Sequence, residues 1–179
     1  LARSDAESQG PWFAPAGFNR GGLEDLNFGG SSQVGFTGAH KILTKQQRDD
    51  LYQVNINPIA RFGAIGKTVV FGQKTLQQKS SALDRINVRR LMIYLKTHIG
   101  RVADNILFDN NIQVTWNNFT AAAGAILSDV QTRFGITEFK LVLDETTTTP
   151  DLVDRNIMYA KIFLKPARSI EFIAVDFVI

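Results

Sequence analysis

The chain has 179 residues, of which 44% are apolar and 21% are charged, and a net charge of +3, as in an ordinary globular domain. It contains no cysteine, which excludes disulfide frameworks, thiol nucleophiles and cysteine-ligated zinc. No apolar run approaches the roughly 18 residues of a membrane-spanning helix, so we expect no membrane anchoring.

The N-terminal part of the chain is irregular in composition. Leu1 to Asp5 include no initiator methionine and no apolar segment, so we do not expect a signal peptide there, and we expect the chain to be a fragment or a processed product. Residues 10–40 are rich in glycine, which favours turns. A disordered linker would hold few aromatic residues, so we expect a long loop pinned to a core. The aromatic residues of this loop are Trp12, Phe13, Phe18, Phe28 and Phe36.

A capping-box pattern at Thr44 and Gln47 predicts a short helix that ends near Gln53, because the two side chains can satisfy each other's backbone amides. Apolar and β-branched runs at 59–62 and 68–71 then predict two strands around a glycine-containing turn. We therefore expect a helix followed by two strands in this part of the chain.

Two long helices are predicted, over residues 81–108 and 115–134, because apolar residues recur there at steps of three and four. Ser81 is the expected N-cap of the first helix, and Gly135 is the expected C-terminal stop of the second. The first apolar stripe consists of Val88, Leu91, Met92, Leu95, Ile99, Val102, Ala103 and Ile106. The second consists of Trp116, Phe119, Ala123, Ile126, Leu127, Val130 and Phe134.

Strands are predicted over most of the remaining chain, at residues 138–143, 157–164 and 170–179. Between them, Pro150 fits the first position of a helical turn that ends near Arg155. This order of elements predicts an α/β fold with a single domain over residues 1–179. In this fold, a two-layer sandwich, the two long helices pack on a mixed β-sheet and the C-terminal strand is extended.

No catalytic, cofactor or metal site is predicted. Gly66-Lys67-Thr68 lacks the earlier glycine of a phosphate-binding P-loop, since position 61 is Arg61, and a strand is expected to follow. His98 lies at the edge of an apolar stripe, which is typical of a structural histidine. One acidic group lacks the spacing of an EF-hand loop, and helix capping and solvation explain it. Its members are Asp144, Glu145, Asp151 and Asp154.

The basic residues form one cluster around the start of the first long helix, where Asp84 opposes them. A pI of about 9.3 is only mildly basic, whereas nucleic-acid-binding proteins usually carry a dense basic stripe. A solvated helix face explains the cluster, and a docking face for an acidic partner surface is the alternative. Its members are Lys79, Arg85, Arg89, Arg90, Lys96 and Arg101.

The last predicted strand, residues 170–179, is apolar on both faces, each interrupted by one charge. Such a strand belongs inside a covered sheet, because at a free edge it would promote aggregation. Pro166 lies shortly before this strand and interrupts continuous backbone hydrogen bonding in the sheet, because proline has no amide donor. Two arrangements follow: the strand is a central strand of its own sheet, or it adds to the sheet of a neighbouring subunit. The expected interface residues are Ile170, Phe172, Ile173, Val175, Phe177 and Val178.

Several short segments, taken in their order along the chain, resemble the C-terminal part of the contractile tail sheath proteins of myovirus-type bacteriophages. The segments are GPWFAPAG at 10–17, RDDLY at 48–52, INP at 56–58, VVFGQKT at 69–75, DRINVRRL at 84–91, TPDLVDR at 149–155 and KPARSIEF at 165–172. Each is short, but their shared order covers nearly the whole chain. The N-terminal half of a sheath protein has no counterpart here, and the glycine-rich stretch is longer than expected.

The resemblance implies a structural subunit that is not an enzyme and uses no cofactor or small-molecule substrate. Family members assemble as hexameric rings in a helical tube around a tail tube, and contraction drives the tube through the host envelope. Their terminal arms add strands to neighbouring core sheets, which favours the inter-subunit arrangement of residues 170–179. The resemblance places the subunit in the virion after assembly in the host cytoplasm. A tube-facing role is the hypothesis for the basic helix residues Arg89, Arg90 and Lys96.

Two alternatives remain. The sheath of a phage-tail-like bacteriocin or of a type VI secretion system would share these features, although residues 84–91 favour a phage. From a different class, the basic pI permits an α/β nucleic-acid-binding module. Salt-dependent DNA binding would support that module, whereas assembly into tubes or rings would oppose it. We expect no direct contact with nucleic acid.

Overall fold

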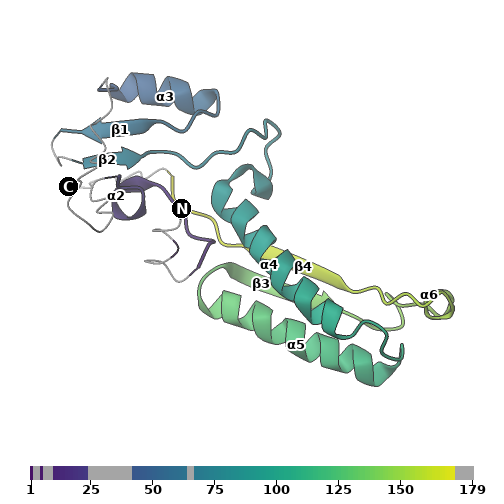
Figure 1. Cartoon of the computed structure of the whole chain (residues 1–179). Coiled ribbons are helices and arrows are strands. Elements are labelled where there is room, and N and C mark those ends of the chain that lie inside the picture. The colour runs from purple at the N-terminus through teal and green to yellow at the C-terminus, as the bar shows by residue number, and fades with distance from the viewer. Residues whose placement is uncertain (2–4, 6–9, 24–41, 64–66, 172–179) are drawn as a thin grey trace, which may run out of the picture. The chain divides into compact units, whose positions relative to one another are not determined.

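The computed structural model describes residues 1, 5, 10–23, 42–63 and 67–171 (Figure 1). Contacts along the chain divide it into two compact units, Leu1–Arg90 and Leu91–Ile179. The first unit holds α2 (Gly17–Arg20), α3 (Lys45–Gln53), β1 (Ile59–Phe62), β2 (Lys67–Val70) and the start of α4 (Ile86–Asn105). The rest of α4 lies in the second unit, together with α5 (Gln113–Thr132), β3 (Ile136–Val142), α6 (Pro150–Asp154) and β4 (Lys161–Pro166).

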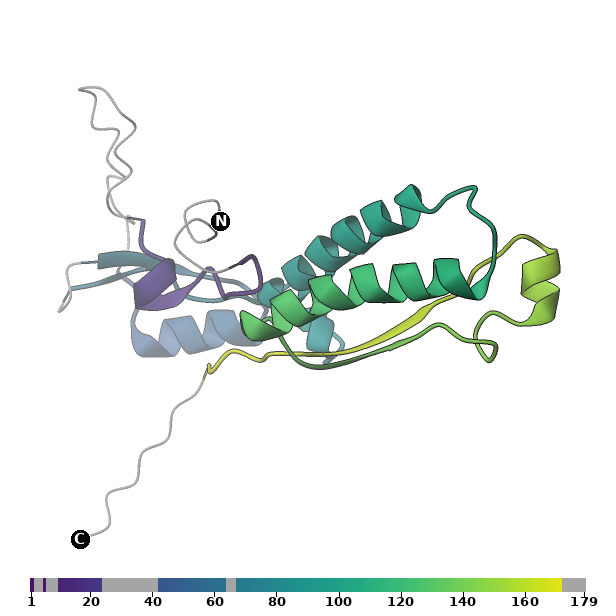
Figure 2. The ribbon, with the colours of Figure 1, turned by 90° about the horizontal axis from the view of Figure 1, so that it is seen from below.

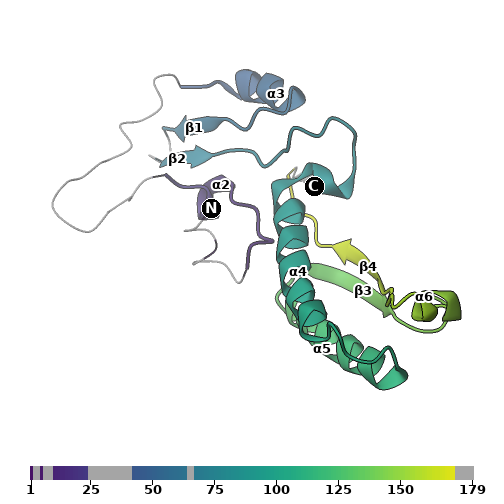
Figure 3. The same cartoon turned by 45° about the vertical axis from the view of Figure 1, so that its right-hand side comes forward.

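The first unit is built on the antiparallel pair β1–β2, which α3 and α2 flank on opposite sides (Figure 3). Gly21 extends this pair, because its carbonyl accepts the amide of Val70 at 2.8 Å, and the amide of Leu23 donates to Thr68 at 2.9 Å. A Cβ atom on Gly21 would stand 2.7 Å from the Val70 carbonyl oxygen. The close approach of the two backbones therefore requires glycine at this position.

The capping box predicted for α3 is confirmed. The Thr44 hydroxyl accepts the Gln47 amide at 3.3 Å, and the Gln47 side chain accepts the Thr44 amide at 3.0 Å. The helix ends at Gln53, and Asn55 in the turn after it has a φ of 61° and so occupies the left-handed region. Asparagine tolerates this conformation better than most residues, and it closes the helix with the Ile56 amide bonded to Leu51.

The first long helix begins later than the sequence predicts. Ser81 accepts the amide of Leu83, but it caps only the short 3-10 turn Ala82–Asp84. Arg85 is extended and forms an antiparallel bridge with Lys74, so α4 starts at Ile86. The helical turn that Ser81 caps therefore does not continue into α4, because Arg85 pairs with a segment that is distant in the sequence. The spacing of apolar residues does not reveal this pairing.

Five of the seven residues of the apolar stripe predicted for the second long helix, α5, are buried, whereas Ile126 is half-buried and Phe134, which follows the helix, is 69% exposed. Trp116, Phe119, Ala123, Leu127 and Val130 are all buried. The stop differs from the prediction, because the left-handed residue is Phe134, with a φ of 61°, and not Gly135.

Two hydrogen bonds close the C-terminal end of α5. Phe134 donates to Gln131 at 3.0 Å, and Gly135 donates to Val130 at 2.8 Å. This is a Schellman ending in which the position usually taken by glycine holds a phenylalanine.

The second unit contains the antiparallel hairpin β3–β4, and α5 runs along it (Figure 2). Phe139 pairs with Leu164 and Leu141 with Ile162 on the more buried face. Pro166 was expected to interrupt the ladder, and it is the last residue of β4, where it pairs with Ile136 beside a register irregularity. Proline is tolerated there because β4 has an outer edge that needs no amide donor.

The described residues thus combine helices with small antiparallel sheets. In place of the single mixed sheet that was predicted, they hold two separate two-stranded antiparallel sheets. The predicted helical turn at Pro150 is present as α6, with the proline in its first turn. Within the described residues, no helix combines the length and apolar character needed to cross a membrane.

Candidate assembly surfaces

The predicted C-terminal interface lies mostly beyond the described residues. Ile170 is described and is 82% exposed. The other predicted members, Phe172, Ile173, Val175, Phe177 and Val178, lie outside the described part of the chain. The last backbone contact of the hairpin is the Ala167 amide, which donates to Gly135 at 3.1 Å. The chain therefore leaves the β3–β4 hairpin before the predicted arm begins.

The β3–β4 hairpin itself offers two open edges. Among the described residues, no further strand pairs with either of them. The face opposite the Phe139–Leu141 side carries the exposed Phe163 between charged residues, and Lys165 pairs with Glu138 there at 3.3 Å. An isolated two-stranded hairpin is marginal in water, and open edges accept added strands. The hairpin is thus a surface suited to β-strand addition.

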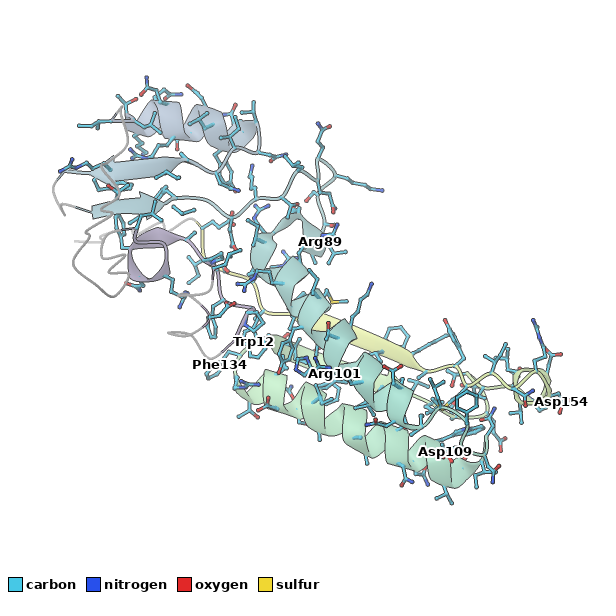
Figure 4. The ribbon with its side chains drawn as sticks, viewed as in Figure 1. Trp12, Arg89, Arg101, Asp109, Phe134 and Asp154 are labelled. Atoms are coloured by element: carbon cyan, nitrogen blue, oxygen red, sulfur yellow. The ribbon has the colours of Figure 1, made fainter. Side chains whose placement is uncertain are left out.

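The three basic residues predicted to act together on the first long helix are not equivalent. Arg89 and Lys96 are exposed and stand two turns apart on one face, with the 65% exposed Ile93 between them. Arg90 is half-buried and forms an ion pair with Asp5. Of the three predicted residues, Arg89 and Lys96 are therefore the exposed ones, and Arg101, which Figure 4 labels with Arg89, is a further exposed basic residue of α4.

The segments that carried the resemblance meet in a polar clasp, which we define as Asn57, Lys74 and Tyr52. The Asn57 amide group donates to the Lys74 carbonyl and accepts the Lys74 amide, both at 2.8 Å. The Lys74 ammonium donates to the Tyr52 carbonyl and lies 3.5 Å from the centre of its ring. A Cβ atom on Gly72 would stand 2.7 Å from Asn57 Oδ1, so glycine makes room for the clasp.

The clasp fixes the entry into α4, because the strand segment that it holds also pairs with Arg85. Thr75 donates its amide and its hydroxyl to the Asp84 carbonyl, at 3.0 and 3.1 Å, and Arg85 donates to the Tyr52 hydroxyl at 3.1 Å. Sequence reasoning did not identify this network. The only signal was an asparagine before proline at positions 57 and 58, followed at a distance by a glycine.

The titratable groups have structural roles. His98 stacks on Tyr94, with ring centres 3.9 Å apart, and its Nδ1 lies 2.9 Å from the Tyr94 carbonyl oxygen, as expected for a structural histidine. The Thr146 hydroxyl, which donates to Asp144, lowers the pKa of that carboxyl below its ordinary value. Asp151 pairs with Arg155 along α6 at 3.6 Å. In the part of the chain that the structure describes, no group of three or more acidic or histidine side chains could hold a metal ion.

Comparison with known proteins identifies the family of the chain. A family model described as the phage tail sheath C-terminal domain matches residues 78–179. The tail sheath proteins of Vibrio phage KVP40 and Enterobacteria phage T4 are 42% and 40% identical over 99% of this chain and 25% of their own lengths. The chain thus spans about a quarter of these relatives.

A solved structure, the anti-feeding prophage helical sheath in its contracted state, matches with a TM-score of 0.78 and 24% identity, over 98% of this chain and 47% of that chain. At this identity the likeness shows the fold, which has the same mixed helix and strand content. The family that the comparisons identify is one of structural sheath proteins and not of enzymes. The chain belongs to the phage tail sheath C-terminal domain family.

Proposed function

We propose that this chain is the C-terminal core part of a contractile tail sheath subunit of a myovirus-type bacteriophage. The observation that carries the proposal is the sheath family match over residues 78–179, together with 40–42% identity to phage tail sheath proteins over 99% of the chain. In this function the subunits assemble in the host cytoplasm, form hexameric rings in a helical tube around the tail tube, and contract to drive the tube through the host envelope.

The hairpin supports the first part of this function, the linkage between subunits. Its two open edges and the half-buried Phe139 and Leu141 leave a sheet that is too small to be complete. Residues 170–179 are apolar on both faces and so suit the interior of a sheet. We assign them to the hairpin of a neighbouring subunit. The added strands would complete the mixed sheet and, with α4 and α5, the two-layer sandwich.

Such strand exchange also explains how the sheath stays connected during contraction. Main-chain hydrogen bonds between an arm and a sheet do not depend on how the two bodies are oriented, provided that the segment between them can bend. Residues 168–169, which follow the last backbone contact of the hairpin at Ala167, supply that segment, and they include the exposed Arg168. The energy of contraction is then stored in the contacts between subunit surfaces, while the arms hold the subunits together.

The exposed basic face of α4 supports a contact with the tail tube. Arg89 and Lys96 are free to meet an acidic surface, and Arg90 contributes by fixing the start of the helix through Asp5. The variant Arg89→Glu/Lys96→Glu should form sheath that no longer assembles on the tube, whereas Lys45→Glu, on the exposed side of α3, should assemble normally. Unchanged tube-templated assembly in the double variant would remove this assignment.

Electron microscopy of the full-length sheath polypeptide, expressed alone, tests the function as a whole. We expect tubular polymers, and persistent monomers with DNA affinity would overturn the proposal. Deleting residues 170–179 should abolish the polymers and leave the domain folded, as judged by circular dichroism. If the truncated chain unfolds instead, the strand belongs to its own sheet.

A close second candidate is the sheath of a phage-tail-like particle, and the likeness to the anti-feeding prophage sheath favours it. The higher identity to two phage tail sheath proteins favours the phage. A nucleic-acid-binding module has less support than its basic pI suggests, since Arg85 and Arg90 are paired with Asp84 and Asp5.

A further inference from the structure

The loop between α4 and α5 projects an apolar group of residues into solvent. Four exposed side chains form this group, which we call the tip: Leu107, Phe108 and Ile112 from the loop, and Val114 from the first turn of α5. Single exposed apolar residues are common on protein surfaces, but a clustered group is typical of an interaction site. Phe108 is the most prominent of the four, because its side chain is fully exposed.

The backbone at Phe108 is also unfavourable. Its φ is 73°, in the left-handed region, where a bulky side chain is disfavoured. The same loop holds Asn110 and Asn111, which would adopt this conformation more easily. Neither the backbone nor the exposed ring gains anything from the fold of the chain itself. A strained, fully exposed aromatic residue is therefore best explained by a partner that binds it.

The tip is held in place by a network of hydrogen bonds. The Asn111 side chain accepts the indole N–H of the buried Trp116 at 2.7 Å and donates to the Ile157 carbonyl at 3.2 Å. The Thr115 hydroxyl donates to the Asn110 carbonyl at 2.8 Å. Because the loop is already ordered, docking of Phe108 costs little conformational entropy.

The charges around the tip indicate what kind of partner it takes. Residues 104–118 include Asp104 and Asp109 but no lysine or arginine, and both aspartates are exposed. Figure 4 places Asp109 and Asp154 near the same end of the second unit. An aromatic knob between carboxylates fits a surface that combines aromatic rings with a cation.

The chain carries such a surface on its first unit. Phe18, Phe62 and Phe71 form an aromatic cluster with ring centres 4.9–6.0 Å apart, and Phe18 and Phe71 are exposed. The Arg48 guanidinium lies over Phe62 and Phe71, at 4.9 and 5.7 Å from their centres. Its Nη1 donates to the Leu43 carbonyl at 2.9 Å, which orients the planar group on the rings.

We propose that the Phe108 tip of one copy docks on the Phe18–Phe62–Phe71–Arg48 cluster of a second copy of this chain. The ring of Phe108 packs on the aromatic cluster, and Asp109 approaches Arg48. The two surfaces differ, so the contact runs head to tail, and contacts of this kind generate rings or helical arrays. The inference rests on the proposed sheath function, because it requires that copies of the chain assemble with one another.

A photo-crosslinker at the tip tests this directly. The full sheath polypeptide with Phe108→p-benzoylphenylalanine should give a light-dependent dimer whose crosslinked peptides join residue 108 to the Phe18, Phe62 or Phe71 region of another copy. The same crosslinker at the equally exposed Leu76 is the control and should not give this product. Polymers seen by electron microscopy without this crosslink would overturn the inference alone. Absence of polymers as well would overturn it together with the proposed function.

A second variant separates docking from folding. Phe108→Gly relieves the left-handed backbone strain, so the variant should unfold at a higher temperature than the parent chain. It should nevertheless raise the concentration needed for polymer formation by about tenfold or more, since buried aromatic anchors dominate interface energies. An unchanged critical concentration would overturn the inference, because the fold is intact in this variant.

Discussion

The two long helices have the same length and the same kind of apolar stripe, yet they are buried to different extents. Helix α5 buries stripe residues from Trp116, near its start, to Val130, near its end, and only Ile126 between them is half-buried. Helix α4 buries Val88, Leu91 and Leu95, but its later apolar positions are only half-buried or, beyond its end, exposed. The later apolar positions are Ile99, Val102, Ala103, Ile106 and Leu107.

This difference shows that the spacing of apolar residues in the sequence identifies the apolar face of a helix. It does not identify which part of the molecule, or which partner, covers that face. Helix α5 lies along β3 and is part of the core of its own unit. The second half of α4 leads to the exposed tip, where a partner rather than the chain itself would complete the burial. For a subunit of a polymer, half-buried apolar residues at the end of a helix are a sign of assembly.

The largest expected change in stability comes from comparing a buried leucine of α5 with an exposed leucine that follows α4. Leu127→Ala removes a fully buried side chain from α5 and should lower the free energy of unfolding by about 2–5 kcal/mol. Leu107→Ala, at a position that is 62% exposed, should change it by less than about 0.5 kcal/mol. Urea denaturation followed by circular dichroism measures both values, and equal losses would contradict the contrast.

A second comparison stays within α4. Leu95→Ala should cost about 2–4 kcal/mol because the side chain is buried, whereas Ile99→Ala at a half-buried position should cost about 1 kcal/mol. The same denaturation experiment applies. If the two substitutions cost the same, α4 is buried along its whole length and the assembly interpretation of its second half loses its basis.

The loop between the two helices provides the next test. Asn111→Ala leaves the indole N–H of the buried Trp116 without its acceptor and should lower the free energy of unfolding by about 1–3 kcal/mol. The indole emission of Trp116 should change as well, because its hydrogen bond is lost. Asn110→Ala is the matched control. The hydrogen bonds of Asn110 use its backbone carbonyl, which accepts from the Thr115 hydroxyl and the Ile112 amide and is kept in alanine, so stability should be nearly unchanged.

The end of α5 carries a smaller, stabilising prediction. Phe134 is 69% exposed and has a positive φ, so Phe134→Gly should raise the free energy of unfolding by about 1 kcal/mol. Phe134→Ala removes the same ring but keeps the backbone strain, and it should give no such gain. A loss of stability in the glycine variant would mean that the ring makes contacts that its exposure does not reveal.

The smallest effect is expected at two mid-helix glycines. A Cβ atom at Gly100 in α4 or at Gly124 in α5 would meet nothing within 4 Å, so alanine at either site should stabilise the chain by about 0.5–1 kcal/mol. Polymer formation provides the second measurement. If Gly100→Ala stabilises the chain but weakens assembly on the tube, a partner approaches α4 closely at that point, beside Lys96. If assembly of the Gly100→Ala variant is unaffected, the contact of α4 with the tube is restricted to Arg89 and Lys96 themselves.

Helix endings show why local rules work in some places and fail in others. α3 and α6 both end on a left-handed asparagine, Asn55 and Asn156, which turn chemistry anticipates. After α5, the left-handed position is taken by Phe134, although Gly135 follows it directly. The preference for glycine at this position therefore predicted the wrong residue. The hydrogen bond from Gly135 to Val130 fixes the position of the turn, and it depends on where the Ile136 strand begins.

The sequence alone determined the type and approximate position of the main elements, because capping boxes, apolar periodicity and a proline at a first helical turn act over a few neighbouring residues. It also determined the family, through the order of short segments along the chain. Three of these segments contribute the residues of the polar clasp, which explains part of the pattern. Only the tertiary structure decided where α4 begins, since that depends on Arg85 pairing with Lys74, eleven residues away. It also decided that β4 ends on Pro166, paired with Ile136, and which apolar residues stay exposed. These features depend on contacts between segments that are distant in the sequence. The free energies of such contacts outweigh local preferences, and the contacts produce no periodic pattern in the sequence from which they could be predicted.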